Sequence, residues 1–148
     1  MKLLIVARHG GYTNDHLDQD GIRQIGILTD KLRPVIGRSS VRILTSTAAR
    51  AQESANILAR AFGVQAEAHD VLWSDEHHPQ NNSAALLLVQ SRGGDVDILM
   101  LVTHFEYAKD FPGYFSTTHL GVRLPSVSIK TGQAWVLDCE KKTIIRIG

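Results

Sequence analysis

Residues 96–103, VDILMLVT, give the strongest strand signal in the chain. A continuous apolar run of this length is typical of a strand that is buried on both faces in the middle of a parallel sheet. Residues 2–7, KLLIVA, form a shorter run of the same kind. The two runs therefore predict two buried strands.

Helical patterns separate the predicted strands. After Asp20, which is a good N-cap residue, apolar residues return every three to four positions, and Pro34 and Gly37 are expected to end that helix. A strand is expected at residues 41–45 (VRILT), followed by a helix over residues 48–62. Strands that alternate with helices in this way predict a parallel sheet, because each helix carries the chain back to the same end.

The remaining elements complete the pattern. Ser46 or Thr47 is expected to cap the helix at 48–62, and Gly63 to end it. Further along we expect a strand at 64–68, a helix at 83–92 closed by Gly93 and Gly94, short helical pieces from 104 to 120 broken by Pro112 and Gly113, and strands at 126–130, 133–137 and 143–147. Three strands in direct succession predict an antiparallel edge on a mainly parallel α/β sheet.

The composition is that of a folded unit with a balanced surface. The chain has 148 residues, 43% of them hydrophobic and 21% charged, without an internal repeat or a low-complexity linker, so we expect a single domain over residues 1–148. Lys and Arg number 16 against 15 Asp and Glu, a formal net charge of +1. This balance argues against a broad basic face for nucleic acid and gives no polybasic membrane anchor.

Cys139 is the one cysteine, which excludes an internal disulfide and every multi-cysteine metal site. A chain of this size without disulfides fits a reducing cytoplasm. The apolar stretch near the N-terminus stops at Arg8, which makes it too short for a signal peptide, and no run is as long as a membrane-spanning helix. We therefore expect a cytoplasmic protein that does not enter a membrane.

Polar side chains follow three of the predicted strands. Arg8 and His9 come directly after the first strand. Arg50 lies one helical turn beyond the second strand, and His104 follows the strongest one. Ligands of open α/β sheets bind beyond the carboxyl ends of the strands, and parallel strands place those ends on one rim. We therefore expect two arginines and two histidines to converge there.

This set of side chains suits a phosphoryl group. A guanidinium can hold phosphate oxygens in bidentate fashion, and a neutral imidazole can attack phosphorus and carry the group covalently. A second histidine, if charged, and the N-terminus of the helix after Ser46 would add positive charge where the transition state is negative. Gly10 and Gly11 would let the backbone approach the phosphate closely. Taken singly, each side chain could be a structural histidine or a surface arginine, but their joint placement favours a site.

Four stretches of the chain form an ordered series of motifs. They are Arg8-His9-Gly10 after the first strand, residues 17–24 (LDQDGIRQ), residues 45–55 (TSTAARAQESA), and Val102-Thr103-His104. The series resembles the histidine phosphatase superfamily, in which Arg-His-Gly is followed by L-T-x-x-G-x-x-Q, S-S-P-x-x-R-A-x-Q-T-A and V-[ST]-H. The resemblance implies the phosphoglycerate mutase-like fold, a three-layer α/β/α sandwich, and a reaction that needs neither a metal nor a cofactor.

The resemblance also implies a role for each matched residue. His9 would be the nucleophile that becomes phosphorylated. The phosphate would be held by Arg8, Arg50 and His104, with Gly10 in the loop beside them.

The chain departs from the family pattern close to these motifs. Many members have Glu directly after Arg-His-Gly and Asn four residues beyond it, whereas this chain has Gly11 and Asp15 at those positions. Asn14 is one position short, so it is a poor candidate for a phosphate contact. Acid-phosphatase members place Asp after the second histidine as proton donor, where this chain has Phe105.

The proton donor must therefore come from elsewhere. Mutase-like members use a Glu after the third strand, where this chain offers Asp75 and Glu76, and we favour Glu76. Glu106 is a further possibility, and Asp75 and Glu76 could instead be plain loop charges. His77 and His78 beside them do not make a metal site, because adjacent histidines point in different directions and no spacing pairs them with another ligand.

The sequence thus predicts a phosphatase that works through a phosphohistidine intermediate. Short members of the family resemble the phosphohistidine phosphatase branch, whose open site accepts a phosphorylated protein side chain. A phosphatase of small phosphorylated metabolites is the second hypothesis. A non-catalytic phosphate-binding module of the same fold is the third. The sequence gives no indication of the oligomeric state.

Overall fold

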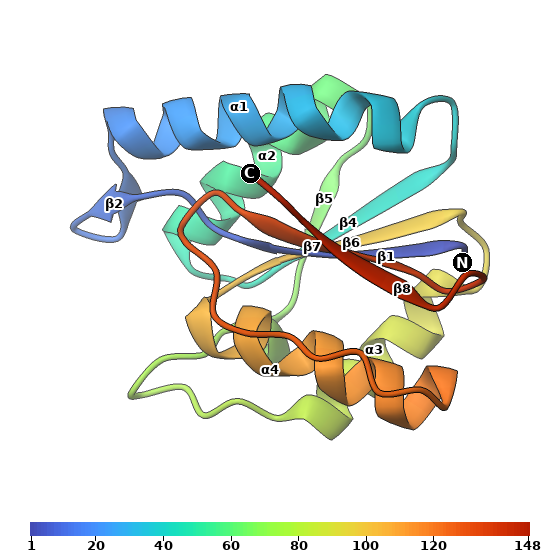
Figure 1. Cartoon of the computed structure of the whole chain (residues 1–148). Helices are drawn as coiled ribbons and strands as arrows, with labels where there is room; N and C mark the ends of the chain where they lie inside the picture. The colour runs from blue at the N-terminus through green and yellow to red at the C-terminus, as the bar shows by residue number, and fades with distance from the viewer.

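The computed structural model describes residues 1–148 and places six strands in one sheet (Figure 1). The strands are β1 (Leu3–Arg8), β4 (Val41–Thr45), β5 (Ala66–Ala68), β6 (Ile98–Thr103), β7 (Ala134–Asp138) and β8 (Thr143–Ile147), in the order β5-β4-β6-β1-β7-β8. Neighbours among β5, β4, β6 and β1 are parallel, whereas β7 is antiparallel to β1, and β8 to β7. The mainly parallel sheet with an antiparallel edge is confirmed.

Strand β6 lies in the centre of the sheet, between β4 and β1. All six of its residues are buried, as the apolar run predicts. Strand β1 pairs with β6 so that Arg8 lies opposite Thr103. This register brings the residues directly after the two strands, His9 and His104, to the same point at the carboxyl end of the sheet.

Helices cover both faces of the sheet (Figure 1). One face carries α1 (Gln19–Ile36) and α2 (Ala49–Phe62), and the other carries α3 (Asn82–Gly93) and α4 (Phe105–Phe115). Successive residues of a strand point to opposite faces, so Ile5 belongs to the apolar core under α1 and α2, and Leu4 to the core under α3 and α4. The three-layer α/β/α sandwich is confirmed.

The start and end of α1 differ from the prediction. The N-cap residue is Asp18, not Asp20, because the Asp18 side chain accepts a hydrogen bond from the backbone N–H of Gly21. Pro34 lies inside the helix and does not end it. Ile36 is buried in the core, which favours continuing the helix beyond Pro34, and Gly37 then ends it with a φ of 53°.

Helix α2 begins without the predicted side-chain cap. Its N-cap residue is Ala48, which makes no side-chain cap bond. The predicted caps have other partners: Ser46 Oγ lies 2.7 Å from Nε2 of His104, and the Thr47 hydroxyl donates to Asp70. Gly63 ends the helix in the left-handed region, at φ 70°, as predicted.

The region after β6 is more regular than the sequence indicates. Helix α4 is continuous through Pro112, because Phe111, Pro112 and Phe115 are all buried by the packing, and a π-helical turn (Ser116–Leu120) comes after it. The strand predicted at 126–130 is absent. In that segment backbone carbonyls accept from side chains instead of a neighbouring strand: Ile129 from Arg8 at 2.9 Å and Val127 from Trp135 at 3.3 Å.

The structure adds two very short strands that the sequence pattern does not predict. Strands β2 (Tyr12–Thr13) and β3 (His16–Leu17) form a hairpin beside the start of α1 (Figure 1). Its two-residue turn consists of Asn14 and Asp15, both with positive φ, at 51° and 67°. The remaining boundaries shift by one or two residues: β5 begins at Ala66 instead of 64, β6 at Ile98 instead of 96, and α3 at Asn82 instead of 83.

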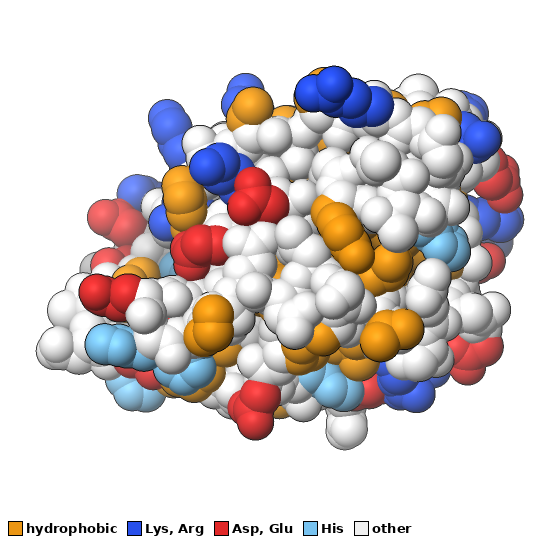
Figure 2. Space-filling view, turned by 90° about the horizontal axis from the view of Figure 1, so that it is seen from below, with side chains coloured by type: hydrophobic (Ala, Val, Ile, Leu, Met, Phe, Trp, Pro, Cys, Tyr) orange, Lys and Arg blue, Asp and Glu red, His pale blue; other side chains and the backbone are white.

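The surface is in keeping with the balanced composition. On the face that α3 and α4 form, Figure 2 shows lysine and arginine side chains around the edge of the view and no broad basic patch. None of the helices combines the length and the apolar character that crossing a membrane requires.

Candidate active site

A cavity of about 430 Å³ opens at the carboxyl ends of the parallel strands. It is lined by Arg8, His9, Tyr12, Arg50, Ser74, Asp75, Glu76, His104, Phe105 and Glu106. The structure thus brings together both predicted arginines, both predicted histidines and all three carboxylates considered as proton donors. Gly10 is absent from this lining.

The two histidines are buried side by side. The backbone N–H of His9 donates to the carbonyl of Thr103 at 3.0 Å, which continues the pairing of β1 with β6 by one residue. The ring centroids of His9 and His104 are 5.1 Å apart, at an interplanar angle of 64°. The two residues are 3% and 2% exposed, so the fold holds both rings against the cavity wall.

The hydrogen bonds of His9 fix where its proton lies. Nδ1 is 2.8 Å from the carbonyl oxygen of Gly10, which can only accept, so Nδ1 carries the proton. In the neutral ring the lone pair then lies on Nε2. This tautomer is the one that a nucleophilic histidine needs, with one nitrogen oriented by the backbone and the other free to attack.

The hydrogen bonds of His104 fix the opposite tautomer. Its Nδ1 accepts from Nη2 of Arg50 at 3.3 Å, since a guanidinium can only donate. Its Nε2 therefore donates to Ser46 Oγ at 2.7 Å. Ser46 and Arg50 lie on either side of the start of α2, so this helix orients the second histidine as well as supplying the arginine.

Burial and nearby positive charge keep both rings neutral near neutral pH. Burial, together with the charges of Arg50 and Arg8, lowers the pKa of His9 to about 4 against the hydrogen bond to Gly10, which raises it. Burial, then His9 and Arg50, lower the pKa of His104 to about 2. A neutral His9 is ready to act as a nucleophile. His104 would gain a proton only when an anion in the cavity offsets the positive charges around it.

The two arginines reach the cavity from different elements. Arg8 is the last residue of β1, and its Nη1 donates to the carbonyl of Ile129 at 2.9 Å. Arg50 is in the first turn of α2 and 8% exposed, with its guanidinium carbon 4.6 Å from the ring centroid of Tyr12. Nε of each arginine and Oγ of Ser74 are buried without a hydrogen-bond partner. Such groups are rare in folded proteins, and here all three belong to residues that line the cavity.

Gly10 lies behind the cavity, where its lack of a side chain is required by packing. A Cβ at Gly10 would be 2.6 Å from the carbonyl oxygen of Gly21, at the start of α1. The N–H of Gly10 donates to Ser54 Oγ at 3.0 Å, and that of Gly11 to Gln24 Oε1 at 2.9 Å. Both amides are therefore already occupied, and the close approach that the two glycines allow is to α1.

The three candidate proton donors have different surroundings. Burial raises the pKa of Asp75, but hydrogen bonds from the His78 ring, the His77 and His78 amides and the Trp73 indole outweigh it and hold the pKa well below its ordinary value. Asp75 is thus held as a carboxylate and is poorly suited to donate a proton. Glu76 is exposed at the rim, and Glu106 is half-buried in the first turn of α4.

The ring of His78 is engaged within its own loop. The ring of His78 stacks on Trp73 with centroids 4.1 Å apart and bonds to Asp75 at 2.8 Å. No group of three or more His, Cys, Asp or Glu side chains in the chain is placed to hold a metal ion.

Sequence reasoning missed three contributors to the site: Tyr12, Ser46 as a partner of His104, and Asp15. The Asp15 carboxylate forms an ion pair with Nη1 of Arg50. A signal for Asp15 was available, since it occupies the position at which the resembling family has Asn. Its contact with Arg50 depends on the β2–β3 hairpin, which two-residue strands do not reveal in a sequence pattern.

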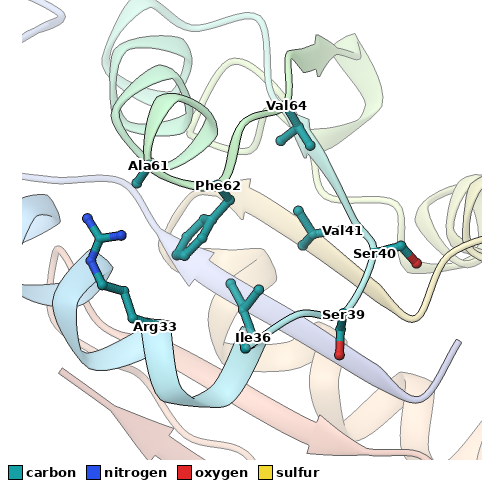
Figure 3. Close-up of a pocket in the computed structure, with 9 residues that line it drawn as sticks. Arg33, Ile36, Ser39, Ser40, Val41, Ala61, Phe62 and Val64 are labelled. Atoms are coloured by element: carbon teal, nitrogen blue, oxygen red, sulfur yellow. The ribbon is translucent and has the colours of Figure 1, made fainter.

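A second hollow, of about 470 Å³, lies between the last turns of α1 and α2 and the start of β4 (Figure 3). Its walls are formed mainly by Ile36, Val41, Phe62 and Val64, and Arg33 is the one charged residue among them. Its lining contains no histidine, cysteine or carboxylate, and Ser39 and Ser40 have no base beside them in it. The cavity at the strand ends is therefore the candidate active site.

Comparison with known proteins gives structural matches only. No family model matches the sequence, and no curated protein matches it significantly. The protein histidine phosphatase SixA, solved in complex with tungstate, superposes with a TM-score of 0.69 at 17% identity, over 99% of this chain and 94% of that one. The chain has the histidine phosphatase fold.

Other solved structures also match over nearly the whole of this chain. A mycobacterial glucosyl-3-phosphoglycerate phosphatase superposes with a TM-score of 0.65 at 15% identity, over 99% of this chain and 97% of that one. The phosphoglycerate mutase from Plasmodium falciparum gives 0.61 at 20% identity, over 99% and 88%. These matches confirm the fold that the four sequence motifs imply.

Proposed function

We propose that the protein is a phosphatase that works through a phosphohistidine intermediate on His9, and that its substrate is a phosphorylated histidine side chain of a protein. The observation that carries the proposal is the placement of a neutral, correctly tautomeric His9 beside His104, Arg8 and Arg50 in one cavity. One structure with this fold is a protein histidine phosphatase in complex with tungstate, an oxyanion, and this likeness supports a phosphatase here.

In the first step the lone pair on Nε2 of His9 forms a bond to phosphorus. The bond between phosphorus and the leaving nitrogen breaks, and its electron pair returns to that nitrogen. Nδ1 keeps its proton, and the hydrogen bond from Nδ1 to the carbonyl oxygen of Gly10 stabilises the positive charge that the ring acquires. Arg8 and Arg50 bind the equatorial oxygens, where negative charge is spread in the transition state, and His104 joins them once the bound anion favours its protonated form.

In the second step a water oxygen attacks phosphorus and the bond to Nε2 of His9 breaks. The electron pair returns to Nε2, which regenerates the neutral ring. Both hydrogens of the water remain with the product, which leaves as the phosphate monoanion. The second step therefore returns His9 to its starting state and completes the catalytic cycle.

The leaving group decides between classes of substrate. An imidazole leaving group that is already protonated departs as a neutral ring and needs no proton, whereas an alkoxide needs one from a general acid. Asp75 is held as a carboxylate, and Phe105 stands where acid-phosphatase members of the resembling family place Asp. A weak supply of protons favours a phosphohistidine over a phosphate ester.

A phosphatase of small phosphorylated metabolites is the second candidate. The observation in its favour is that Glu76 lines the same cavity as His9, so its carboxyl group could protonate an ester oxygen. Residues 1–148 would form one catalytic domain in either case.

The test compares substrates under one set of conditions. A phosphohistidine-containing protein, a sugar phosphate and a nucleotide are each incubated with the purified protein, and phosphate release is measured. We expect the phosphohistidine protein to be hydrolysed fastest. His9→Ala should abolish both phosphate release and the formation of an acid-labile phosphoenzyme. His119→Ala, at an exposed position outside the cavity, should retain both. Equal inactivity of wild type and His9→Ala, with phosphate still bound, would identify a binding module instead.

A further inference from the structure

Asp15 lies at the tip of the β2–β3 hairpin and pairs with Arg50, an arginine of the candidate active site. Both turn residues, Asn14 and Asp15, have positive φ, which directs the Asp15 side chain back toward α2. There its carboxylate pairs with Nη1 of Arg50. The side chain of Asp15 is 44% exposed while that of Arg50 is 10% exposed, so the ion pair faces the mouth of the cavity.

Four contacts, made by residues on both strands, hold the hairpin in place. Glu53 of α2 accepts from the backbone N–H of Leu17 at 2.8 Å and lies 3.0 Å from Nδ1 of His16. The ring of Tyr12 lies over the guanidinium of Arg50 and meets the ring of His9 edge-on, with centroids 5.3 Å apart. These contacts on both strands fix the position of Asp15.

Carboxylates in and beside the cavity offset the positive charge of its two arginines. Both histidines are neutral, which leaves Arg8 and Arg50 as the cations. Asp15 pairs with Arg50, and Oδ2 of Asp75 lies 3.9 Å from its Nη2. Asp75, Glu76 and Glu106 are the carboxylates of the lining, and Asp15 reaches Arg50 from the hairpin beside it. A phosphomonoester dianion that enters the cavity would meet an Arg50 whose positive charge is already balanced by the carboxylate of Asp15.

We propose that Asp15 determines the substrate preference of the site by keeping its carboxylate on Arg50 while the phosphoryl group binds. The proposal rests on the proposed function and narrows it to phosphoramidates whose nitrogen is protonated. A carboxylate that stays paired with Arg50 repels a phosphomonoester dianion bound there and attracts the positive charge on a protonated leaving nitrogen. A phosphohistidine carries both charges, whereas a phosphate ester carries only the one that Asp15 disfavours.

The experiment replaces the charge and keeps the shape. Asp15→Asn removes one negative charge, and Asn tolerates the positive φ at this position. Asp15→Gly is the second variant, since Gly adopts the same φ and has no side chain to reach Arg50. Asp20→Asn is the matched control, because Asp20 is exposed, pairs with Arg23 on α1 and loses the same charge outside the cavity.

Two quantities are measured for each folded variant: the Kd of inorganic phosphate at mildly alkaline pH, and the ratio of kcat/KM for a phosphomonoester to kcat/KM for a phosphohistidine protein. We expect Asp15→Asn and Asp15→Gly to tighten phosphate binding about tenfold or more and to raise the ratio by a similar factor. Asp20→Asn should change either quantity by less than about twofold. Thermal unfolding checks that each variant is folded.

The opposite sign would overturn the proposal. If Asp15 served only to orient Arg50, both variants would bind phosphate more weakly, and hydrolysis of the two substrate classes would fall together. Phosphate binding is measured without turnover, so it tests Asp15 even if the protein hydrolyses neither substrate. Loss of the proposed function and loss of this inference are therefore distinguishable.

Discussion

His9 and His104 meet with their rings 5.1 Å apart, and they carry their protons on different nitrogens, Nδ1 in His9 and Nε2 in His104. The arrangement follows from the register of β1 on β6, which ends with Arg8 opposite Thr103. Each ring is then oriented by a group outside the pair: the carbonyl of Gly10 for His9, and Ser46 with Arg50 for His104. The two histidines thus present different faces to the same cavity.

The close packing of Gly10 and Gly11 against the start of α1 predicts that a single added methyl group destabilises the fold. A Cβ at Gly21 would lie 1.9 Å from the carbonyl oxygen of Gly11, so Gly21→Ala must push the loop away from the helix. We expect the free energy of unfolding to fall by about 2 kcal/mol or more. The measurement is denaturant unfolding.

Gly26→Ala is the matched control on the same helix. A Cβ at Gly26 meets nothing within 4 Å, so the substitution adds helix propensity without a clash. It should raise the free energy of unfolding by about 0.5–1 kcal/mol. Equal effects of the two substitutions would show that the loop does not depend on this contact.

Arg50 is expected to stabilise the transition state of phosphoryl transfer. Arg50→Ala should lower kcat/KM by roughly a hundred- to a thousandfold, as removal of a preorganised donor to a developing oxyanion does elsewhere. Arg60→Ala, at an exposed position in the last turn of the same helix, should leave kcat/KM near that of the wild type. Steady-state kinetics with one substrate decide the matter, and a loss of less than about tenfold for Arg50→Ala would contradict the role.

The lowered pKa values of the histidines predict how stability depends on pH. The unfolded chain protonates these side chains near pH 6.5, whereas the folded protein resists protonation until about pH 4 at His9 and about pH 2 at His104. The unfolded state therefore binds more protons over this window, and the free energy of unfolding falls as the pH is lowered from about 6.5 to about 4. The slope is at most about 1.4 kcal/mol per pH unit for each ring.

Denaturant unfolding at a series of pH values measures this slope. His16 has the opposite sign, since its bond to Glu53 raises its pKa, but it is fully exposed and contributes little. His9→Gln should flatten the dependence, and His119→Ala should retain it. A stability that stays constant or rises as the pH falls through this window would show that the rings are not held neutral by the fold.

Glu76 is expected to matter for one class of substrate only. If its carboxyl group protonates an ester oxygen, Glu76→Gln should lower kcat/KM for a phosphomonoester by about a hundredfold and leave hydrolysis of a phosphohistidine protein nearly unchanged. Glu106→Gln tests the other free carboxyl group of the lining, and Glu140→Gln is an exposed control. An equal loss for both substrates would assign Glu76 to binding instead of proton transfer.

The sheet and the central site residues were predictable because they depend on local apolar runs and on the residues directly after those runs. Strand β6 is recognisable from its apolar composition, and His104 from its position after that strand. Asp15 was not predictable as an Arg50 partner, since the contact needs a hairpin of two-residue strands. The continuity of α4 through Pro112 likewise depends on how Phe111 packs, which the local sequence does not contain.

The candidate site draws side chains from both halves of the sandwich. His104 is the N-cap residue of α4, above one core, while Arg50 lies in the first turn of α2, above the other. During refolding, a chain that has consolidated only one of these cores would hold an incomplete set of groups. If the protein has the proposed activity, its recovery should therefore track the slower core to form, and turnover would report the final step of folding and not the appearance of secondary structure.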